Sequence, residues 1–243
     1  MLANMILESA RAMGIDMTEH QASQFARYHE MLVEANSQFN LTRVPDELRE
    51  AVDRNYLDCI SPLAHDFPAG VKTLIDVGSG AGFPGIPLSI MLPDVHVVLV
   101  DALDKRVKFL KSVIDELHLN AEAIHARAED AAKRADLREQ FDIATARAVA
   151  AANLLAEYLL PFVKVGGRML ALKGPSLDEE LDAAAYAFEV LGGRVERIES
   201  AEIPGRDWSH RLAYIEKIAP TPAKYPRKPG MPEKQPLIVA KKC

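Results

Sequence analysis

The segment Asp76-Val77-Gly78-Ser79-Gly80-Ala81-Gly82-Phe83-Pro84-Gly85 contains four glycines within its last eight residues and follows a short apolar run. Residues 73–77 predict a buried strand, and residues 86–91 predict the first turns of a helix. Glycine lets the backbone turn sharply and approach a ligand closely, and the free N–H groups at the start of a helix attract anions. The segment therefore predicts a strand–turn–helix corner that binds a nucleotide-like ligand.

Two ligand classes match the spacing of these glycines. Gly80, Gly82 and Gly85 fit the G-x-G-x-x-G fingerprint of NAD-linked oxidoreductases. Asp76, Gly78, Gly80 and Gly82 fit the loop that holds S-adenosylmethionine in Rossmann-like methyltransferases. A tight turn without any ligand is the third interpretation, and a cluster of four glycines behind a buried strand disfavours it.

Composition narrows the class of protein. A chain of 243 residues can form one α/β domain with an extension. No apolar stretch is long enough for a membrane span, and residues 1–13 lack the pattern of a cleaved signal peptide. The only cysteines are Cys59 and Cys243, so we expect no structural disulfide and no metal-ligand cluster. These features favour a cytoplasmic protein that is not attached to a membrane.

Charge is unevenly distributed along the chain. The formal net charge is −6, yet the segment from residue 217 to the C-terminus has seven basic residues and one acidic residue. A basic segment on an acidic body is typical of a nucleic-acid-binding surface or of a solvated tail. Taken alone, the composition favours the solvated tail.

Hydrophobic patterning divides the chain into three parts: a helical extension over residues 1–66, an α/β domain over residues 67–219, and a basic tail over residues 220–243. Capping boxes at Thr18 and Ser176 predict the starts of two helices. Within the α/β domain, strands are predicted at 73–77, 95–100, 121–125, 141–145, 168–172, 194–202 and 210–218. Helices are predicted at 86–91, 105–117, 131–139, 148–163 and 177–191.

This element order favours one fold class. Alternating strands and helices predict a parallel sheet covered on both faces, and the last two strands, which have no helix between them, should pair antiparallel. Five β–α units followed by a strand–loop–strand unit are typical of the class I methyltransferase fold, a seven-stranded, mostly parallel Rossmann-like sheet with one antiparallel strand. An NAD-linked oxidoreductase would need a substrate domain, for which the chain has no room.

The candidate cofactor-binding and substrate-binding residues lie near the ends of the predicted strands. Asp101 ends the second predicted strand, where a carboxylate suits ribose hydroxyls. Ala128 and Glu129 follow the third strand, where their backbone groups suit an adenine edge or simply begin a helix. Arg147, near the end of the fourth, can fix the cofactor, contact a guanine edge or form a salt bridge. The Asn/Asp-Pro-Pro-aromatic motif of amino methyltransferases is absent there, which leaves an acceptor such as guanine N7.

The segments that carry a family resemblance are the glycine segment with Ile86-Pro87-Leu88, Phe39-Asn40-Leu41-Thr42, Val100-Asp101-Ala102, Lys105-Arg106-Val107-Lys108-Phe109-Leu110, Ala128-Glu129, Arg147-Ala148-Val149, Lys173-Gly174 and Tyr225-Pro226-Arg227-Lys228-Pro229-Gly230. With them the chain resembles the bacterial 16S rRNA (guanine-N7) methyltransferases of the small subunit, the glucose-inhibited division protein B family. The resemblance implies S-adenosylmethionine as cofactor and, as substrate, one guanine in the decoding-region loop of 16S rRNA.

Carried over onto matching positions, the resemblance implies cofactor contacts at Gly78, Phe83, Ala128, Glu129 and Arg147, with Asp101 near the ribose. Gly80 and Gly82 of the glycine segment are candidate cofactor contacts as well. The candidates for substrate contacts are Arg147, Lys173, Arg227 and Lys228, the last three through phosphates. The family more often has His at position 55 and Ser at position 59, so neither Asn55 nor Cys59 is assigned a role. The competing hypotheses are an NAD-linked oxidoreductase and a non-catalytic RNA-binding module.

Overall fold

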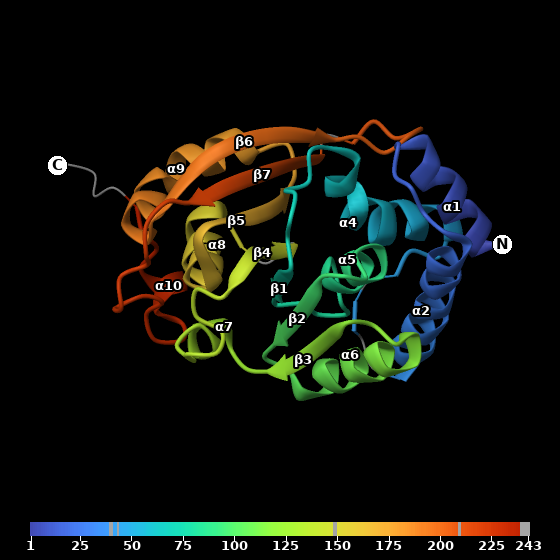
Figure 1. Cartoon of the computed structure of the whole chain (residues 1–243), viewed down its shortest axis with the longest axis horizontal. Helices are drawn as coiled ribbons and strands as arrows, with labels where there is room; N and C mark the ends of the chain where they lie inside the picture. Colours follow the sequence, from blue (N-terminus) through green and yellow to red (C-terminus); the bar gives the residue numbers. More distant parts are fainter. Residues whose placement is uncertain (39–40, 43, 148–149, 209, 239–243) are drawn as a thin grey trace.

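Seven strands form one sheet in the order β3-β2-β1-β4-β5-β7-β6, with helices on both of its faces (Figure 1). The computed structural model describes the chain except residues 39–40, 43, 148–149, 209 and 239–243. The strands are β1 Thr73–Val77, β2 His96–Asp101, β3 Ala121–His125, β4 Phe141–Arg147, β5 Val163–Lys173, β6 Gly193–Ala201 and β7 His210–Lys217. Strand β7 pairs antiparallel with both of its neighbours, and β1 to β5 pair parallel. The predicted fold class is confirmed.

The helices are α1 Leu2–Ala12, α2 Glu19–Gln38, α3 Leu48–Ala51, α4 Asp58–Ile60, α5 Gly85–Met91, α6 Asp104–Leu117, α7 Ala128–Ala131, α8 Ala152–Leu159, α9 Leu177–Leu191 and α10 Met231–Lys234, with a π-helical turn at Val52–Leu57 and 3-10 turns at Ser61–Ala64 and Leu160–Phe162. The Thr18 capping box is formed: the Thr18 amide donates to Gln21 Oε1 at 2.9 Å, and the Gln21 amide donates to Thr18 Oγ1 at 3.2 Å. At Ser176 the box is absent, because that hydroxyl bonds Glu180 instead. Within the described residues, no helix is both long enough and apolar enough to cross a bilayer.

Two predicted helices differ from the structure. The helix predicted at residues 131–139 is replaced by the short α7 and a series of turns that ends at Glu139, whose φ is +55°. The Arg138 guanidinium donates to the carbonyl of Ala132 and to two carbonyls near the C-terminus, and these tertiary bonds hold the turns. The helix predicted at 148–163 begins at Ala152, and its first two residues lie outside the described part of the chain.

The N-terminal helices share a hydrophobic core with one face of the sheet. Phe25, Leu32 and Tyr56 are fully buried in the same cluster as Leu74 of β1 and Leu110 of α6. In Figure 1, α2 and α4 lie beside α5 and α2 also lies beside α6, while the Tyr28 hydroxyl of α2 bonds the Ala81 carbonyl of the glycine turn. The domain boundaries proposed at residues 66 and 219 stay predictions.

The topology also fixes where a ligand can enter. Strand β1 lies between β2 and β4, so the strand order reverses at β1. In open α/β sheets, ligands bind outside the carboxyl ends of the strands at such a switch point. The glycine turn follows the carboxyl end of β1 and therefore lies at this position.

Candidate functional site

A pocket of about 210 Å³ opens at the carboxyl ends of β1 and β2. Gly78, Asp101, Ala128 and Glu129, four of the predicted cofactor contacts, line this pocket together. Tyr158 from α8 lines it as well and was not predicted, because nothing in the sequence places the end of that helix beside α7. The structure thus brings together residues that three separate strand–helix junctions contribute.

Hydrogen bonds hold the glycine turn against β2. The amides of Gly78 and Ser79 donate to the Val100 carbonyl at 2.8 and 3.1 Å. The Gly80 amide donates to Asp101 Oδ2 at 2.9 Å, and Gly80 has a φ of +60°, in the region that favours glycine. Asp101 Oδ1 accepts a bond from the Leu103 amide at 2.9 Å. Asp101 therefore shapes the turn and also presents a carboxylate at the pocket.

A second carboxyl group, Asp76 at the end of β1, is fully buried beneath the turn. Its Oδ2 accepts a bond from the Gly85 amide at 3.0 Å, while its Oδ1 has no hydrogen-bond partner among the described residues. Burial raises the pKa of Asp76 to about 7, although the Gly85 bond acts in the opposite direction. An unpartnered buried carboxylate oxygen is costly, which agrees with the direction of the pKa shift.

Gly82 and Phe83 lie in a packed layer outside this pocket. A Cβ on Gly82 would meet the Ile86 side chain at 2.5 Å, and the Phe83 side chain is buried against Tyr28 and Tyr56, with ring centroids 5.7 and 6.1 Å apart. Their predicted contacts with the cofactor stay predictions. A Cβ on Gly85 would lie 2.2 Å from the Leu99 side chain, which makes Gly85 a packing glycine.

Arg147 lies at the end of β4 with its guanidinium over the Phe83 ring, 4.6 Å from Cζ to the ring centroid. Its Nη1 donates to the Arg54 carbonyl at 2.6 Å and lies 3.3 Å from Asp58 Oδ2. The other oxygen of Asp58 lies 2.8 Å from His210 Nδ1. This cluster joins the π-helical turn, α4, β4 and β7, and no sequence pattern indicates that Asp58 and His210 meet.

Two residues left unassigned from the sequence lie near this cluster. Asn55 is almost fully buried, and its Nδ2 has no partner among the described residues. Cys59 is a buried free thiol whose pKa is raised by burial, with Arg147 acting in the opposite direction. A thiol with a raised pKa is a poor nucleophile, which agrees with chemistry that uses no cysteine.

Lys173 lies one strand further along the sheet, because Arg147 pairs with Leu172 across β4 and β5. Its ammonium donates to the Ala150 carbonyl at 2.5 Å and to Glu180 Oε2 at 2.7 Å. Arg147 and Lys173 are therefore neighbouring cations at adjacent strand ends. The bond to Glu180 partly neutralises Lys173 in the free protein.

Arg227 and Lys228 occupy a different place, beside α8. The Arg227 guanidinium is bound to the buried carboxylate of Glu157, with Nη2 at 2.6 Å from Oε2. The Lys228 side chain is exposed and forms no ion pair within the described part of the chain. The four predicted substrate residues thus form two groups, and their contact with RNA stays a prediction.

Comparison with known protein sequences identifies the family to which the chain is similar. The family model described as GidB, rRNA small subunit methyltransferase G, matches residues 21–208. The Ribosomal RNA small subunit methyltransferase G of Lactobacillus johnsonii is 46% identical over 228 residues, which cover 92% of this chain and 95% of that protein. Its counterpart in Clostridium perfringens (strain SM101) is 43% identical over 235 residues, 96% of this chain and 98% of that protein.

Solved structures agree on the fold. The crystal structure of the cyclase SpnF superimposes with a TM-score of 0.51 at 15% sequence identity, covering 82% of this chain and 96% of that chain. At this identity the likeness shows the fold alone.

Proposed function

This chain belongs to the rRNA small subunit methyltransferase G family, and we propose that it transfers a methyl group from S-adenosylmethionine to N7 of one guanine in the decoding-region loop of 16S rRNA. As a member of this family the chain is an S-adenosylmethionine-dependent rRNA methyltransferase. The guanine, its N7 atom and the loop are the proposed part. The observation that supports the proposal most directly is the pocket in which Gly78, Asp101, Ala128 and Glu129 meet.

The residues around the pocket fit this cofactor. The glycine turn leaves backbone without side chains beside the pocket, and the Asp101 carboxylate suits ribose hydroxyls. We propose that Gly78, Gly80, Asp101, Ala128 and Glu129 hold the cofactor, and that Gly82, Phe83 and Arg147 act through or beside the turn. When bound, the cofactor supplies a methyl group on a sulfonium, which is open to attack by a lone pair.

The protein's own contribution is to position the acceptor. Guanine N7 has a free lone pair, so it forms the new N–C bond without losing a proton and needs no general base. Arginine pairs well with guanine O6 and N7, and Arg147 lies at the strand end beside the turn. Its bonds to Arg54 and Asp58 fix its guanidinium. Catalysis is then the alignment of N7 with the methyl group, with Lys173 and Lys228 as proposed phosphate contacts.

A two-step experiment tests this proposal. First, the protein is titrated with S-adenosylhomocysteine and, separately, with NADH, and we expect binding of the former only. Second, labelled S-adenosylmethionine and small-subunit rRNA are incubated with the protein, and the modified base is mapped. Label at N7 of a single guanine in the decoding-region loop is the expected result. Label on another atom or another base would contradict the proposal, as would tight binding of NADH alone.

A further inference from the structure

The segment from Thr221 to Lys234, here called the C-terminal strap, runs along α7 and α8 (Figure 1). It is firmly attached to the body of the protein. The Arg138 guanidinium donates to the carbonyls of Thr221 and Tyr225, both at 2.8 Å. Two further attachments fall on helices that form the wall of the cofactor pocket.

The first attachment joins the strap to α8. Glu157 is 1% exposed, and its carboxylate accepts bonds from Arg227 Nε, Arg227 Nη2 and the Arg227 amide at 2.9, 2.6 and 2.9 Å. Arg227 Nη1 donates to the carbonyl of Gln235, the residue directly after the strap, at 2.6 Å. The next residue of α8 is Tyr158, which lines the pocket. Arg227 thus compensates a buried charge directly beside the pocket wall.

The second attachment joins the strap to α7. Glu129 is 4% exposed, lines the pocket, and accepts a bond from the Gly230 amide to Oε1 at 3.1 Å. Gly230 has a φ of +79°, a conformation that other residues rarely adopt, and this turns its amide toward the carboxylate. Both wall residues therefore depend on the strap. Glu129 does so through its own carboxylate, and Tyr158 does so through the preceding residue and through its hydroxyl, which donates to Glu233 Oε1 of the strap at 3.4 Å.

We infer that Arg227 and Gly230 are positioning residues for the cofactor pocket, and that the strap holds Glu129 and Tyr158 in the geometry that binds S-adenosylmethionine. The inference rests on the proposed assignment of that pocket to the cofactor. According to this inference, the Arg227 guanidinium pairs with Glu157 and does not contact an RNA phosphate. The exposed Lys228 keeps its charge available to RNA, as do Lys224 and Lys234 of the same strap.

The physical reason is the burial of Glu157. Removing one partner of a buried ion pair leaves the other charge without compensation, which is strongly unfavourable. The helix must then move to hydrate Glu157, or the carboxyl group must take up a proton. Either change disturbs α8 next to Tyr158. Replacing both partners by apolar side chains removes the unpaired charge and leaves the helix in place.

The test compares Arg227→Met with Lys228→Met, a neighbouring substitution that also exchanges a cation for methionine. S-adenosylhomocysteine affinity is measured by calorimetry, and affinity for small-subunit rRNA by filter binding, on variants shown by circular dichroism to be folded. We expect Arg227→Met to weaken S-adenosylhomocysteine binding at least tenfold, and Lys228→Met to change it less than twofold. For rRNA the larger loss should come from Lys228→Met.

A rescue variant shows whether Arg227 acts through Glu157. In Arg227→Met/Glu157→Met, S-adenosylhomocysteine affinity should return to within about threefold of the wild type, because no charge is left unpaired. No such rescue is expected for a lost phosphate contact. If Arg227→Met does not fold, Arg227→Lys replaces it in the test. Lysine keeps the positive charge but lacks the planar guanidinium that bonds both oxygens of Glu157. The S-adenosylhomocysteine affinity of this variant should therefore lie between that of the wild type and a tenfold loss.

Each outcome decides between the inference and the function on which it rests. Wild-type protein that does not bind S-adenosylhomocysteine would overturn the proposed function and the strap's role together. Wild-type binding that is unchanged in folded Arg227→Met would overturn the strap's role alone. The same holds if Arg227→Met weakens rRNA binding only, or if the double variant fails to recover.

Discussion

Asp76 makes the stability of the protein dependent on pH. Its pKa is about 7 in the folded protein against an ordinary value of 3.8, because the carboxyl group is buried. The folded state therefore holds this proton more tightly, so the contribution to stability is complete below pH 3.8 and is lost as pH rises through 7. In Asp76→Asn, the fall in unfolding free energy between pH 4 and pH 8 should be smaller, by at most about 4 kcal/mol.

Urea denaturation of wild type and Asp76→Asn at matched pH values measures this difference. Asparagine keeps an oxygen that can accept the Gly85 bond, so the variant removes the titration and leaves the turn supported. Identical pH profiles for the two proteins would show that Asp76 titrates at an ordinary pKa.

Close packing, rather than contact with a ligand, requires glycine at position 85. An added Cβ would lie 2.2 Å from Leu99 Cδ2 and 2.8 Å from Asp76 Oδ2, whereas a Cβ on Gly174 would meet no atom within 4 Å. Overpacking of this kind costs about 1–3 kcal/mol. Gly85→Ala should therefore lower the melting temperature clearly and Gly174→Ala should not, as measured by calorimetry. Equal melting temperatures would mean that α5 shifts freely away from β2.

Single residues show where prediction from the sequence stops. Asp101 lines the pocket, because a strand end and a glycine turn fix its position through local chain geometry, and its contact with the cofactor stays a prediction. Arg227 was expected to face RNA, since nothing in its own segment indicates the buried Glu157, 70 residues earlier in the chain. Asp58 and His210 lie 152 residues apart, and their contact depends on how β7 inserts beside β5.

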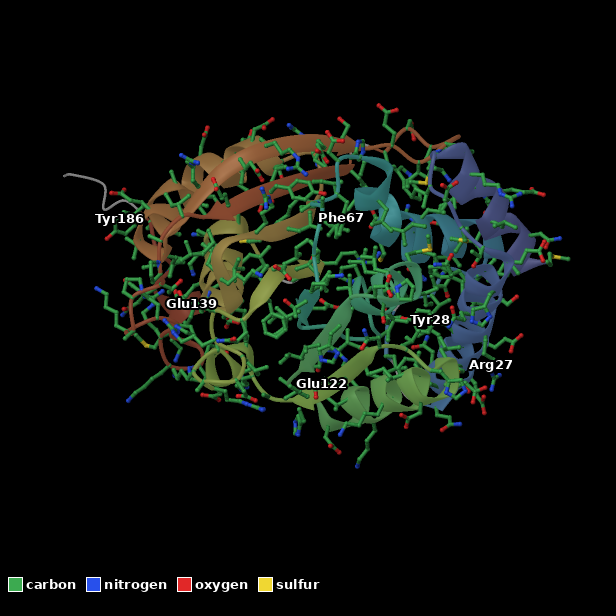
Figure 2. All side chains as sticks on the ribbon, in the orientation of Figure 1. Arg27, Tyr28, Phe67, Glu122, Glu139 and Tyr186 are labelled. Carbon is green, nitrogen blue, oxygen red and sulfur yellow. The ribbon has the colours of Figure 1, made fainter. Side chains whose placement is uncertain are left out.

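At the scale of elements, α2 supports the glycine turn through one hydroxyl group. The Tyr28 hydroxyl donates to the Ala81 carbonyl at 2.6 Å, and both groups are buried. Figure 2 shows Tyr28 directed inward from α2, while Arg27 beside it is directed outward. Loss of the hydroxyl leaves the carbonyl unsatisfied, which costs about 1–3 kcal/mol. We expect Tyr28→Phe to lose this stability and to weaken S-adenosylhomocysteine binding.

Tyr186 on α9, also labelled in Figure 2, provides the matched control. It is 39% exposed, and its hydroxyl has no hydrogen-bond partner within the described residues, so Tyr186→Phe should change neither quantity. Chemical denaturation and calorimetric titration of both variants make the comparison. If Tyr28→Phe behaves like Tyr186→Phe, the N-terminal helices cover the turn without supporting it.

Elements were predictable where the pattern is local. All seven strands and their antiparallel member follow from apolar runs, turn residues and the order of helices. The prediction of a helix at 131–139 was wrong because hydrogen bonds from Arg138 to distant carbonyls override the helical pattern of this segment. The π-helical turn at Val52–Leu57 was not predicted either, since its extra residue per turn depends on tertiary packing, including that against α1.

At the scale of the whole molecule, charge decides how RNA can approach. The net charge is −6, so a polyanion is repelled by most of the surface and must be held by a local group of cations. Several cations near the strand ends are already paired, as Lys173 is with Glu180 and Arg211 is with Asp178. Lys228 is exposed on the strap without an ion pair among the described residues, as are Lys224 and Lys234, and it is therefore an expected contributor to salt-dependent binding.

Lys228→Ala should reduce the salt dependence of rRNA binding. Each phosphate contact contributes about 0.9 to the slope of log affinity against log salt concentration for duplex, and about 0.7 for single strands. The slope for the variant should be smaller by about that amount, so that the two affinities converge at high salt. Lys72, exposed just before β1 at the amino ends of the parallel strands, provides the control, and Lys72→Ala should leave the slope unchanged. Equal losses of slope in both variants would mean that RNA responds to net charge alone and that the strap offers it no specific contact.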